Sequence, residues 1–129
     1  MTQTRQTIKT EAAPRAIGPY SQAVRVGDTV YLSGQLGFDP RAMELVAGGV
    51  EPEARRVFEN IKAVVAAAGG SLAHICKVTI FLADINDFPK VNEIMAQYFS
   101  EPYPARSTFA VAALPRNARV EVECVLSLA

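Results

Sequence analysis

The sequence contains few of the residues on which metal, nucleotide and membrane sites depend. Its one histidine, His74, and its two cysteines, Cys76 and Cys124, form none of the paired spacings typical of metal sites or catalytic triads. Both thiols are expected to be packed inside the protein. The chain has neither a GxGxxG nor a GxxxxGK[ST] motif, and no run of about eighteen apolar residues. We therefore expect no metal, no cofactor and no membrane-spanning helix.

The sequence also lacks an excess of charge of either sign. Thirteen basic residues balance thirteen acidic ones, so the basic surface that nucleic-acid binding requires is not expected. Residues 1–14 lack the apolar core of a secretory signal, which predicts a cytoplasmic protein with reduced cysteines. Because the chain has no internal repeat and no low-complexity linker, residues 1–129 are expected to form a single domain.

What the sequence does contain is a series of strand-like and helix-like periods. Residues 22–36 consist of two β-prone runs around Gly27 and Asp28, a pattern typical of a hairpin. From residue 51, apolar residues recur at helical spacing until Gly69 and Gly70 end the pattern. The other expected elements are a weak strand at residues 6–10, a strand at 77–84, a helix from 87 to 99, and strands at 106–111 and 119–128.

The resulting order, β-β-β-α-β-α-β-β, predicts an α+β fold: a two-layer sandwich of a mostly antiparallel sheet with two helices on one face. Asp87 is expected to cap the second helix, and the last two strands are expected to pair as a hairpin. The uncovered face would carry Tyr31, Phe81 and Glu121 among other side chains. Because that mixture is too apolar for open water, we expect an oligomer packed through this face.

The candidate chemical groups are polar residues scattered over turns, strands and the second helix. Tyr20 follows a Gly-Pro turn that would present its ring, Ser33 lies in a strand, and Asn92 lies on the second helix. Arg106 interrupts a β-prone run with a permanent charge that needs partners. It could form an ion pair with Glu121, or its guanidinium could bind a ligand carboxylate through two hydrogen bonds. Composition and spacing leave both hypotheses open.

Several segments, taken in order, resemble the RidA/YjgF family of reactive-imine deaminases. These segments are AIGPYSQA, SGQ, the pattern D-x-N-D-F-x-x-V-N at residues 84–92, and P-A-R-S at residues 104–107. The resemblance covers nearly the whole chain. It implies a chorismate-mutase-like fold and a homotrimer with sites in clefts between subunits. It also implies hydrolysis of short 2-imino acids, such as 2-iminobutanoate and 2-iminopropanoate, to 2-oxo acids and ammonia without a metal or cofactor.

The resemblance further implies a role for each candidate residue. Arg106 would bind the substrate carboxylate, and Glu121 would activate the attacking water as a general base. Glu121 would stay ionised because of the nearby Arg106 charge. Tyr20 would position water or substrate, while Ser33 and Asn92 would line the cleft and contact the substrate.

The chain departs from the family pattern at Thr108, where many relatives have cysteine, and in a short loop before Pro104. Thr108 is counted among the expected substrate-binding residues, and thiol chemistry at this position is excluded. Two other functions remain open. One is an endoribonuclease or translation inhibitor, which the balanced charge disfavours. The other is a non-catalytic regulatory module that binds small carboxylic acids.

Overall fold

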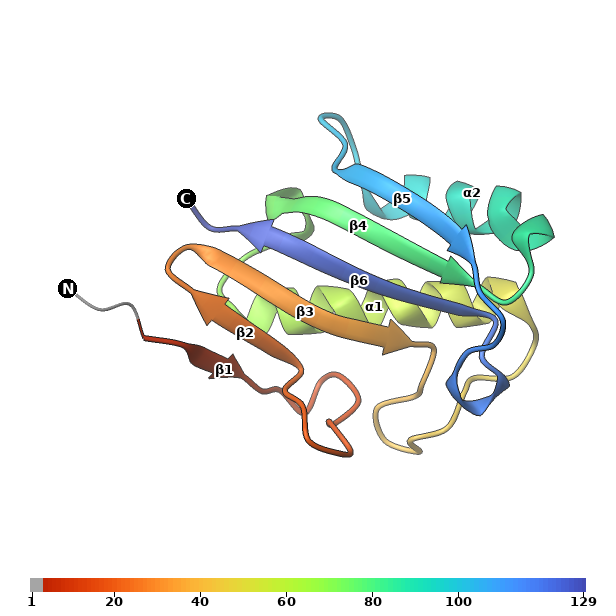
Figure 1. The fold of residues 1–129 in the computed structure, drawn as a ribbon, viewed down its shortest axis with the longest axis horizontal. Coiled ribbons are helices and arrows are strands. Elements are labelled where there is room, and N and C mark those ends of the chain that lie inside the picture. Colours follow the sequence, from red (N-terminus) through yellow and green to blue (C-terminus); the bar gives the residue numbers. More distant parts are fainter. Residues whose placement is uncertain (1–3) are drawn as a thin grey trace.

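A six-stranded sheet in the order β1-β2-β3-β6-β4-β5 forms the frame of the protein (Figure 1). The computed structural model describes residues 4–129. The strands are β1 (Gln6–Ile8), β2 (Ala23–Val26), β3 (Thr29–Leu36), β4 (Ile75–Leu82), β5 (Ala105–Ala110) and β6 (Val120–Ser127). Neighbouring strands are antiparallel except β4 and β5, which are parallel. A parallel pair needs a crossover between its strands, and α2 (Phe88–Tyr98) supplies it.

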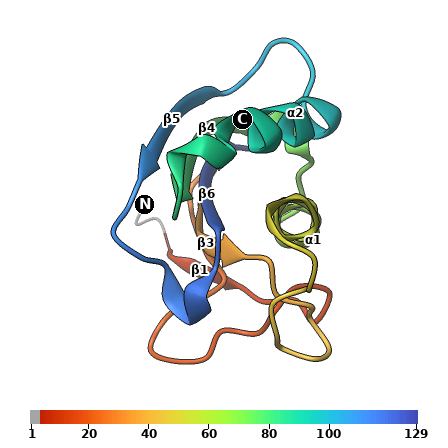
Figure 2. The same ribbon diagram turned by 90° about the vertical axis from the view of Figure 1, so that its right-hand side faces the viewer.

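Both α-helices cover the same face of the sheet (Figure 2). α1 (Val50–Ala67) turns Val57, Phe58 and Ile61 inward, and each of these side chains is fully buried. The sheet meets them with alternate residues of each central strand, which is the period expected of a sheet with one covered face. The predicted two-layer α+β sandwich and its β2–β3 hairpin are therefore confirmed.

The predicted hairpin of the last two strands is wrong. β5 pairs only with β4 at the edge of the sheet, whereas β6 lies between β3 and β4. Residues 111–119 carry the chain from that edge to the centre. The reason is burial: Val120, Val122 and Leu126 of β6 are 0% exposed. A strand with such apolar side chains is stabilised most in the centre of the sheet, where strands pair with it on both sides. β5 has exposed residues at both ends, which suits an edge.

The predicted cap of the second helix also needs correction. Asp87 makes no side-chain capping bond and has helical backbone angles itself. The capping residue is Asp84, whose carboxylate accepts a hydrogen bond of 2.9 Å from the backbone N–H of Asn86. A short 3-10 turn, η2 (Ile85–Asp87), leads from that cap directly into α2. The chain therefore begins to coil one turn earlier than the apolar period indicates.

A buried carboxylate anchors the start of α1 to the start of β6. Glu53 is 2% exposed, and its side chain accepts hydrogen bonds from the backbone N–H of Arg119 at 2.8 Å and from the Arg119 guanidinium at 3.1 Å. Gly37, just after β3, allows the backbone of α1 to lie close to the chain at this point, because a Cβ there would lie 2.8 Å from the Glu53 carbonyl oxygen. This pairing satisfies the buried charge and fixes the chain at Arg119, two residues before Glu121.

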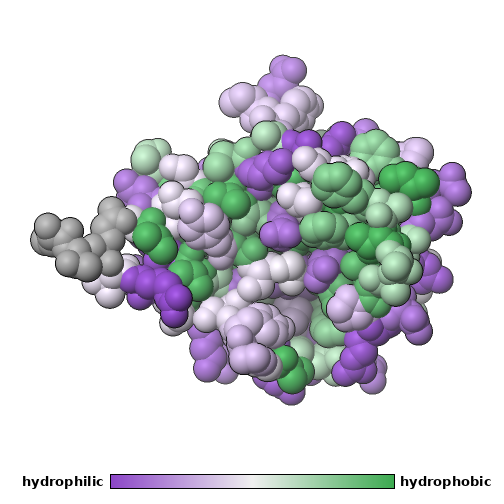
Figure 3. Space-filling view, in the orientation of Figure 1, coloured by the Kyte–Doolittle hydropathy of each residue, from purple (hydrophilic) through white to green (hydrophobic). Residues whose placement is uncertain are grey.

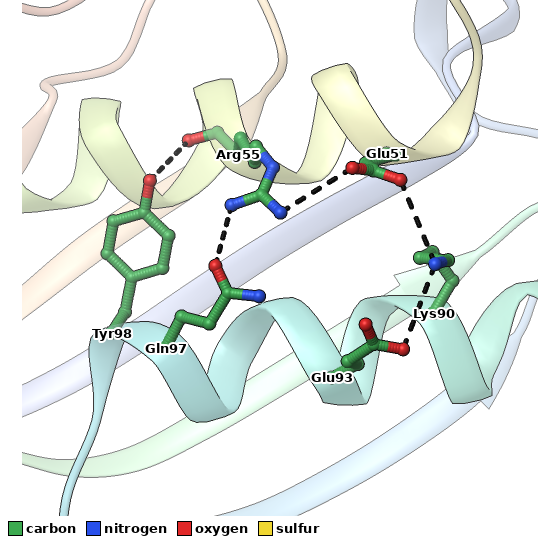
Figure 4. A network of polar contacts seen from close by, with 6 residues as sticks. All are labelled: Glu51, Arg55, Lys90, Glu93, Gln97 and Tyr98. Carbon is green, nitrogen blue, oxygen red and sulfur yellow. Dashed lines mark hydrogen bonds and ion pairs between the residues drawn. The ribbon is translucent and has the colours of Figure 1, made fainter.

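A chain of polar contacts joins the exposed edges of α1 and α2 (Figure 4). Arg55 donates to the side-chain oxygen of Gln97 at 2.8 Å, and the Lys90 ammonium lies 3.8 Å from the Glu51 carboxylate. The Tyr98 hydroxyl donates to the Glu59 carboxylate at 2.8 Å and lies 3.4 Å from the Arg55 carbonyl. Such exposed contacts each contribute little to stability, so the register of the two helices depends mainly on their buried sides.

The other face of the sheet has no helical cover in the described part of the chain. Tyr31 and Phe109 on this face are each 53% exposed, although both are large apolar side chains. Figure 3 views the molecule from this side, where hydrophobic and hydrophilic surface alternate. Among the residues that the structure describes, neither helix is long and apolar enough to cross a bilayer.

Candidate active site

Arg106 lies near the start of β5 and points toward α2. Its partner in the sheet is Val78, which faces the helices. The Arg106 Nη1 donates to the Asn92 side-chain oxygen at 2.6 Å and lies 3.7 Å from the Met95 sulfur. The guanidinium carbon is 5.0 Å from the centre of the Phe88 ring, close enough for a cation–π attraction. The α2 side chains therefore hold one edge of the guanidinium in place.

The other edge of the Arg106 guanidinium is free. Its Nε and Nη2 make no hydrogen bond with any residue in the range 4–129. The side chain lines a groove whose walls are Asn92, Met95, Ala96, Phe99, Tyr103 and Pro104. Because a guanidinium presents its N–H donors as a rigid fork, a carboxylate can bind such a free edge through two parallel hydrogen bonds.

A second groove brings together Tyr20, Ser33 and Glu121. The Ser33 hydroxyl donates to the Ser21 carbonyl at 2.5 Å, which holds the Tyr20 loop against β3. Gln22, 3% exposed, donates to the Pro14 carbonyl at 2.8 Å and so fixes the other arm of the same loop. The Tyr20 ring itself is 53% exposed and free to contact a ligand.

Glu121 lies directly over the backbone of β3. The pairing of β3 with β6 shifts register between Leu32 and Gln35, and Gly34 lies within this bulge. A Cβ at Gly34 would come within 2.7 Å of a Glu121 carboxylate oxygen, so any larger residue would displace the carboxylate from this position. Burial raises the pKa of Glu121, and the neighbouring charge of Glu123 raises it further.

Arg106 and Glu121 do not meet within one chain. Glu121 alternates with the buried Val120 and Val122 along β6, so it projects from the uncovered face, whereas Arg106 projects toward α2. The ion-pair hypothesis for Arg106 therefore fails for the part of the chain that the structure describes. The expected effect of Arg106 on Glu121 is also absent: the pKa of Glu121 is raised, because burial and Glu123 act on it instead.

Thr108 lies two residues after Arg106 and faces the same side of the sheet, opposite Ile80. Its hydroxyl is buried and has no hydrogen-bond partner among the described residues. It does not line the Arg106 groove in this structure. A buried hydroxyl without a partner costs stability. In this conformation the Thr108 side chain is not exposed in the groove where the predicted substrate contact would form.

The remaining candidates lie outside both grooves. The His74 ring accepts a hydrogen bond of 3.0 Å from the Ser71 backbone N–H and so stabilises a turn. Cys124 is buried, as expected, and burial together with Glu123 raises its pKa to about 12. Cys76 is exposed, so the prediction of two packed thiols is wrong for it. No group of three His, Cys, Asp or Glu side chains in residues 4–129 could hold a metal ion.

The predicted site residues include neither Gly34 nor Gln22, although the glycine in SGQL indicates a close backbone approach. Neither carries a reactive group, and their importance depends on a β-bulge and a loop conformation that no local period reveals. The glycine between Ser33 and Gln35 was the one available signal, because an isolated glycine in a strand is typical of a bulge or a close approach.

Comparisons with known proteins show which family the chain resembles. Residues 10–127 match the family model described as endoribonuclease L-PSP. The chain is 52% identical over 122 residues to a 2-iminobutanoate/2-iminopropanoate deaminase of the mite Dermatophagoides farinae, and the match covers 95% of each chain.

Two crystal structures are also similar. RidA from an Antarctic Psychrobacter has a TM-score of 0.93 and 54% identity, covering 95% of this chain and 99% of that one. A candidate endoribonuclease from Thermotoga maritima has a TM-score of 0.94 and 46% identity, covering 96% and 98%. On this sequence and structural evidence, the chain belongs to the RidA/YjgF family.

Proposed function

We propose that this protein is a deaminase that hydrolyses short 2-imino acids, with 2-iminobutanoate and 2-iminopropanoate as substrates. The observation that carries this proposal is the free donor edge of Arg106, held in orientation by Asn92 at 2.6 Å. A 2-imino acid offers a planar carboxylate that fits such an edge. The similarity to relatives that bear the name of this deaminase supports the same choice.

The complete site requires two copies of the chain. Arg106 and Glu121 project from opposite faces of one sheet, so one substrate molecule cannot reach both in a single chain. A second copy packed on the uncovered face would bring its own Arg106 to the Glu121 groove and would also bury Tyr31 and Phe109. Cyclic symmetry repeats such a contact until the ring closes. We propose that the ring is a homotrimer with one site in each cleft.

The proposed reaction begins when Arg106 of one subunit binds the substrate carboxylate and fixes the direction of the C=N bond. The imine nitrogen is protonated, and Glu121 of the neighbouring subunit accepts a proton from water while the water oxygen bonds to the imine carbon and the C=N electron pair moves to nitrogen. The product of this step is a carbinolamine. Glu121 then returns the proton to the nitrogen, and the C–N bond breaks as the C=O bond forms, with the hydroxyl proton passing to the Glu121 carboxylate. Ammonia and a 2-oxo acid leave.

The environment of Glu121 suits this double role. A group that must accept and later donate a proton works best with a pKa near the working pH, and burial raises the pKa of Glu121 toward that range. We propose that Tyr20 positions the attacking water or the imine. Ser33 holds the loop that carries Tyr20, and Asn92 holds Arg106, so both would act mainly by positioning.

The test is to measure deamination with the imine made in place by a threonine dehydratase and the 2-oxo acid followed over time. We expect Arg106→Ala to lose turnover while the assembly and the circular dichroism spectrum stay as in the wild type. Arg25→Ala, which removes a half-buried arginine that donates to the Gly27 carbonyl at 2.8 Å and has a weak ion pair of 3.5 Å outside both grooves, is the control. Full activity of Arg106→Ala would refute the role of Arg106 in binding the carboxylate.

An endoribonuclease activity is the second candidate, because the matching family model carries that description. The balanced charge of the chain speaks against it. The test is RNA cleavage by highly purified protein, in parallel with Glu121→Gln. Cleavage by the wild type that the substitution abolishes would establish this second activity in the same groove.

A further inference from the structure

Two arginines that the proposed reaction does not use line the Glu121 groove. Arg15 and Arg116 both belong to its wall. Neither side chain makes an ion pair or hydrogen bond with any residue in the range 4–129, whereas Arg25, Arg55 and Arg119 each have a carboxylate partner. An arginine needs acceptors for its donors, so these two groups are open to a ligand.

The backbone at Arg116 is strained. Its φ is 59° and its ψ is 23°, in the left-handed region that residues other than glycine rarely adopt. Met43, with a φ of 57°, lines the same groove. Such conformations cost free energy and persist where the surrounding structure imposes them, most often at ligand sites. The fold therefore places the Arg116 side chain in this wall at some cost to stability.

The charge of the groove is unbalanced. Glu121 is the one carboxylate among its lining residues, against the two guanidinium groups of Arg15 and Arg116. Neither arginine lies within ion-pair distance of Glu121 among the described residues. Neither is a cause of the shifted pKa of Glu121, which burial and Glu123 raise. The two arginines are therefore not counter-ions of Glu121, and they favour a second negative group in the ligand.

We infer that Arg116, together with Arg15, binds a second carboxylate on the substrate side chain, so that imines of acidic amino acids, such as 2-iminoglutarate and 2-iminosuccinate, are substrates. This inference rests on the proposed function, in which Arg106 of a neighbouring subunit binds the first carboxylate. The guanidinium fork matches a planar carboxylate better than other side-chain groups. The imine carbon between the two carboxylates then lies beside Glu121.

The first experiment measures binding alone, because imine chemistry is then not needed. Calorimetric titration compares 2-oxoglutarate with 2-oxopentanoate, which has the same number of carbon atoms and lacks the second carboxylate. We expect the wild type to bind 2-oxoglutarate about tenfold more tightly, the size typical of one charge-assisted hydrogen bond. Arg116→Gly should remove most of this preference, because it deletes the guanidinium while glycine accepts the left-handed backbone. Arg116→Lys should keep part of it.

The control is Arg41→Ala, which removes another exposed arginine whose side chain makes no contact with a carboxylate among residues 4–129 and which lies outside the groove. It should leave the preference unchanged. Equal affinity of the wild type for the two 2-oxo acids would overturn the inference. An unchanged preference in both Arg116→Gly and Arg15→Ala would overturn it as well.

The second experiment measures turnover of 2-iminoglutarate and 2-iminobutanoate by the wild type and Arg116→Gly. We expect the substitution to lower kcat/KM for 2-iminoglutarate about tenfold and to leave 2-iminobutanoate within about twofold. An equal loss for both imines would show that Arg116 is structural. If the wild type hydrolyses neither imine, the proposed function fails, while the calorimetric preference still decides whether Arg116 binds a second carboxylate.

Discussion

Arg106 and Glu121 project from opposite faces of the same sheet, although the chain carries them on two strands that are separated only by β4. Arg106 is held by α2 through Asn92, and Glu121 lies over Gly34 of β3 on the uncovered face. A site that uses both residues must therefore include two copies of the chain. If both residues take part in the reaction, activity depends on the assembly of several copies of the chain.

Two inactive variants should restore activity when they are mixed. Arg106→Ala and Glu121→Gln each damage one half of the shared site. In the proposed trimers assembled from an equal mixture, a site is intact when its Arg106 comes from a Glu121→Gln subunit and its Glu121 from an Arg106→Ala subunit. We expect about a quarter of wild-type activity after joint unfolding and refolding. Each variant refolded alone is the control, and a mixture as inactive as its components would argue for a site within one chain.

Gly34→Ala should lower kcat with little effect on folding. The new Cβ would lie 2.7 Å from a Glu121 carboxylate oxygen, which forces the carboxylate to move by a few tenths of an ångström or more. We expect a loss of about tenfold or more in kcat, because small displacements of a general base are costly. In the background of Glu121→Gln the same substitution should have almost no effect. An equal loss in both backgrounds would show that Gly34 acts independently of Glu121.

Glu123→Gln should shift the acid limb of the pH–rate profile to lower pH. The charge of Glu123 is the second cause, after burial, of the raised pKa of Glu121. Removing this charge lowers that pKa, so the base stays ionised in more acidic solution. The measurement is kcat/KM between pH 4 and 9 for the wild type and the variant. An unchanged acid limb would mean that another group controls it.

The same raised pKa predicts how Glu121 affects stability. The folded chain holds this proton more tightly than the unfolded chain, whose value lies near 4.5. Stability therefore falls as the pH rises from the unfolded to the folded pKa, and the cost is complete above the latter. Glu121→Gln should raise the melting temperature at pH 7 and have much less effect at pH 4. A lower melting temperature of Glu121→Gln than of the wild type at pH 7 would show that the fold stabilises the ionised carboxylate.

Thr108→Val should stabilise the protein. The Thr108 hydroxyl is buried without a partner among the described residues, and valine has nearly the same shape without the polar group. We expect a gain of about 1 kcal/mol in the free energy of unfolding, measured by denaturant titration with Thr108→Ser as the control. The KM should stay within about twofold of the wild type. A large rise in KM would show that the hydroxyl turns toward the substrate, as the family resemblance predicts.

Much of the fold follows from the sequence. Periods of two and of 3.6 residues locate the strands and both helices, since they record which face of each element is buried. The Gly27-Asp28 turn and the glycines after α1 locate the hairpin and the helix end. For the site, Arg106 was a candidate because a charge in a β-prone run is visible locally, and Ser33 was predicted because SGQ resembles the family motif.

The order of the strands and the assignment of side chains to faces depend on tertiary structure. The insertion of β6 between β3 and β4 is decided by long-range burial, so the predicted final hairpin failed. The separation of Arg106 from Glu121 follows from that insertion and from the parallel pairing of β5. The bulge at Gly34 likewise comes from the pairing of β3 with β6, two segments far apart in the chain. By itself the sequence determined the elements and the chemical groups; packing alone decided which groups share a groove, because contacts between segments far apart in the chain leave no local period.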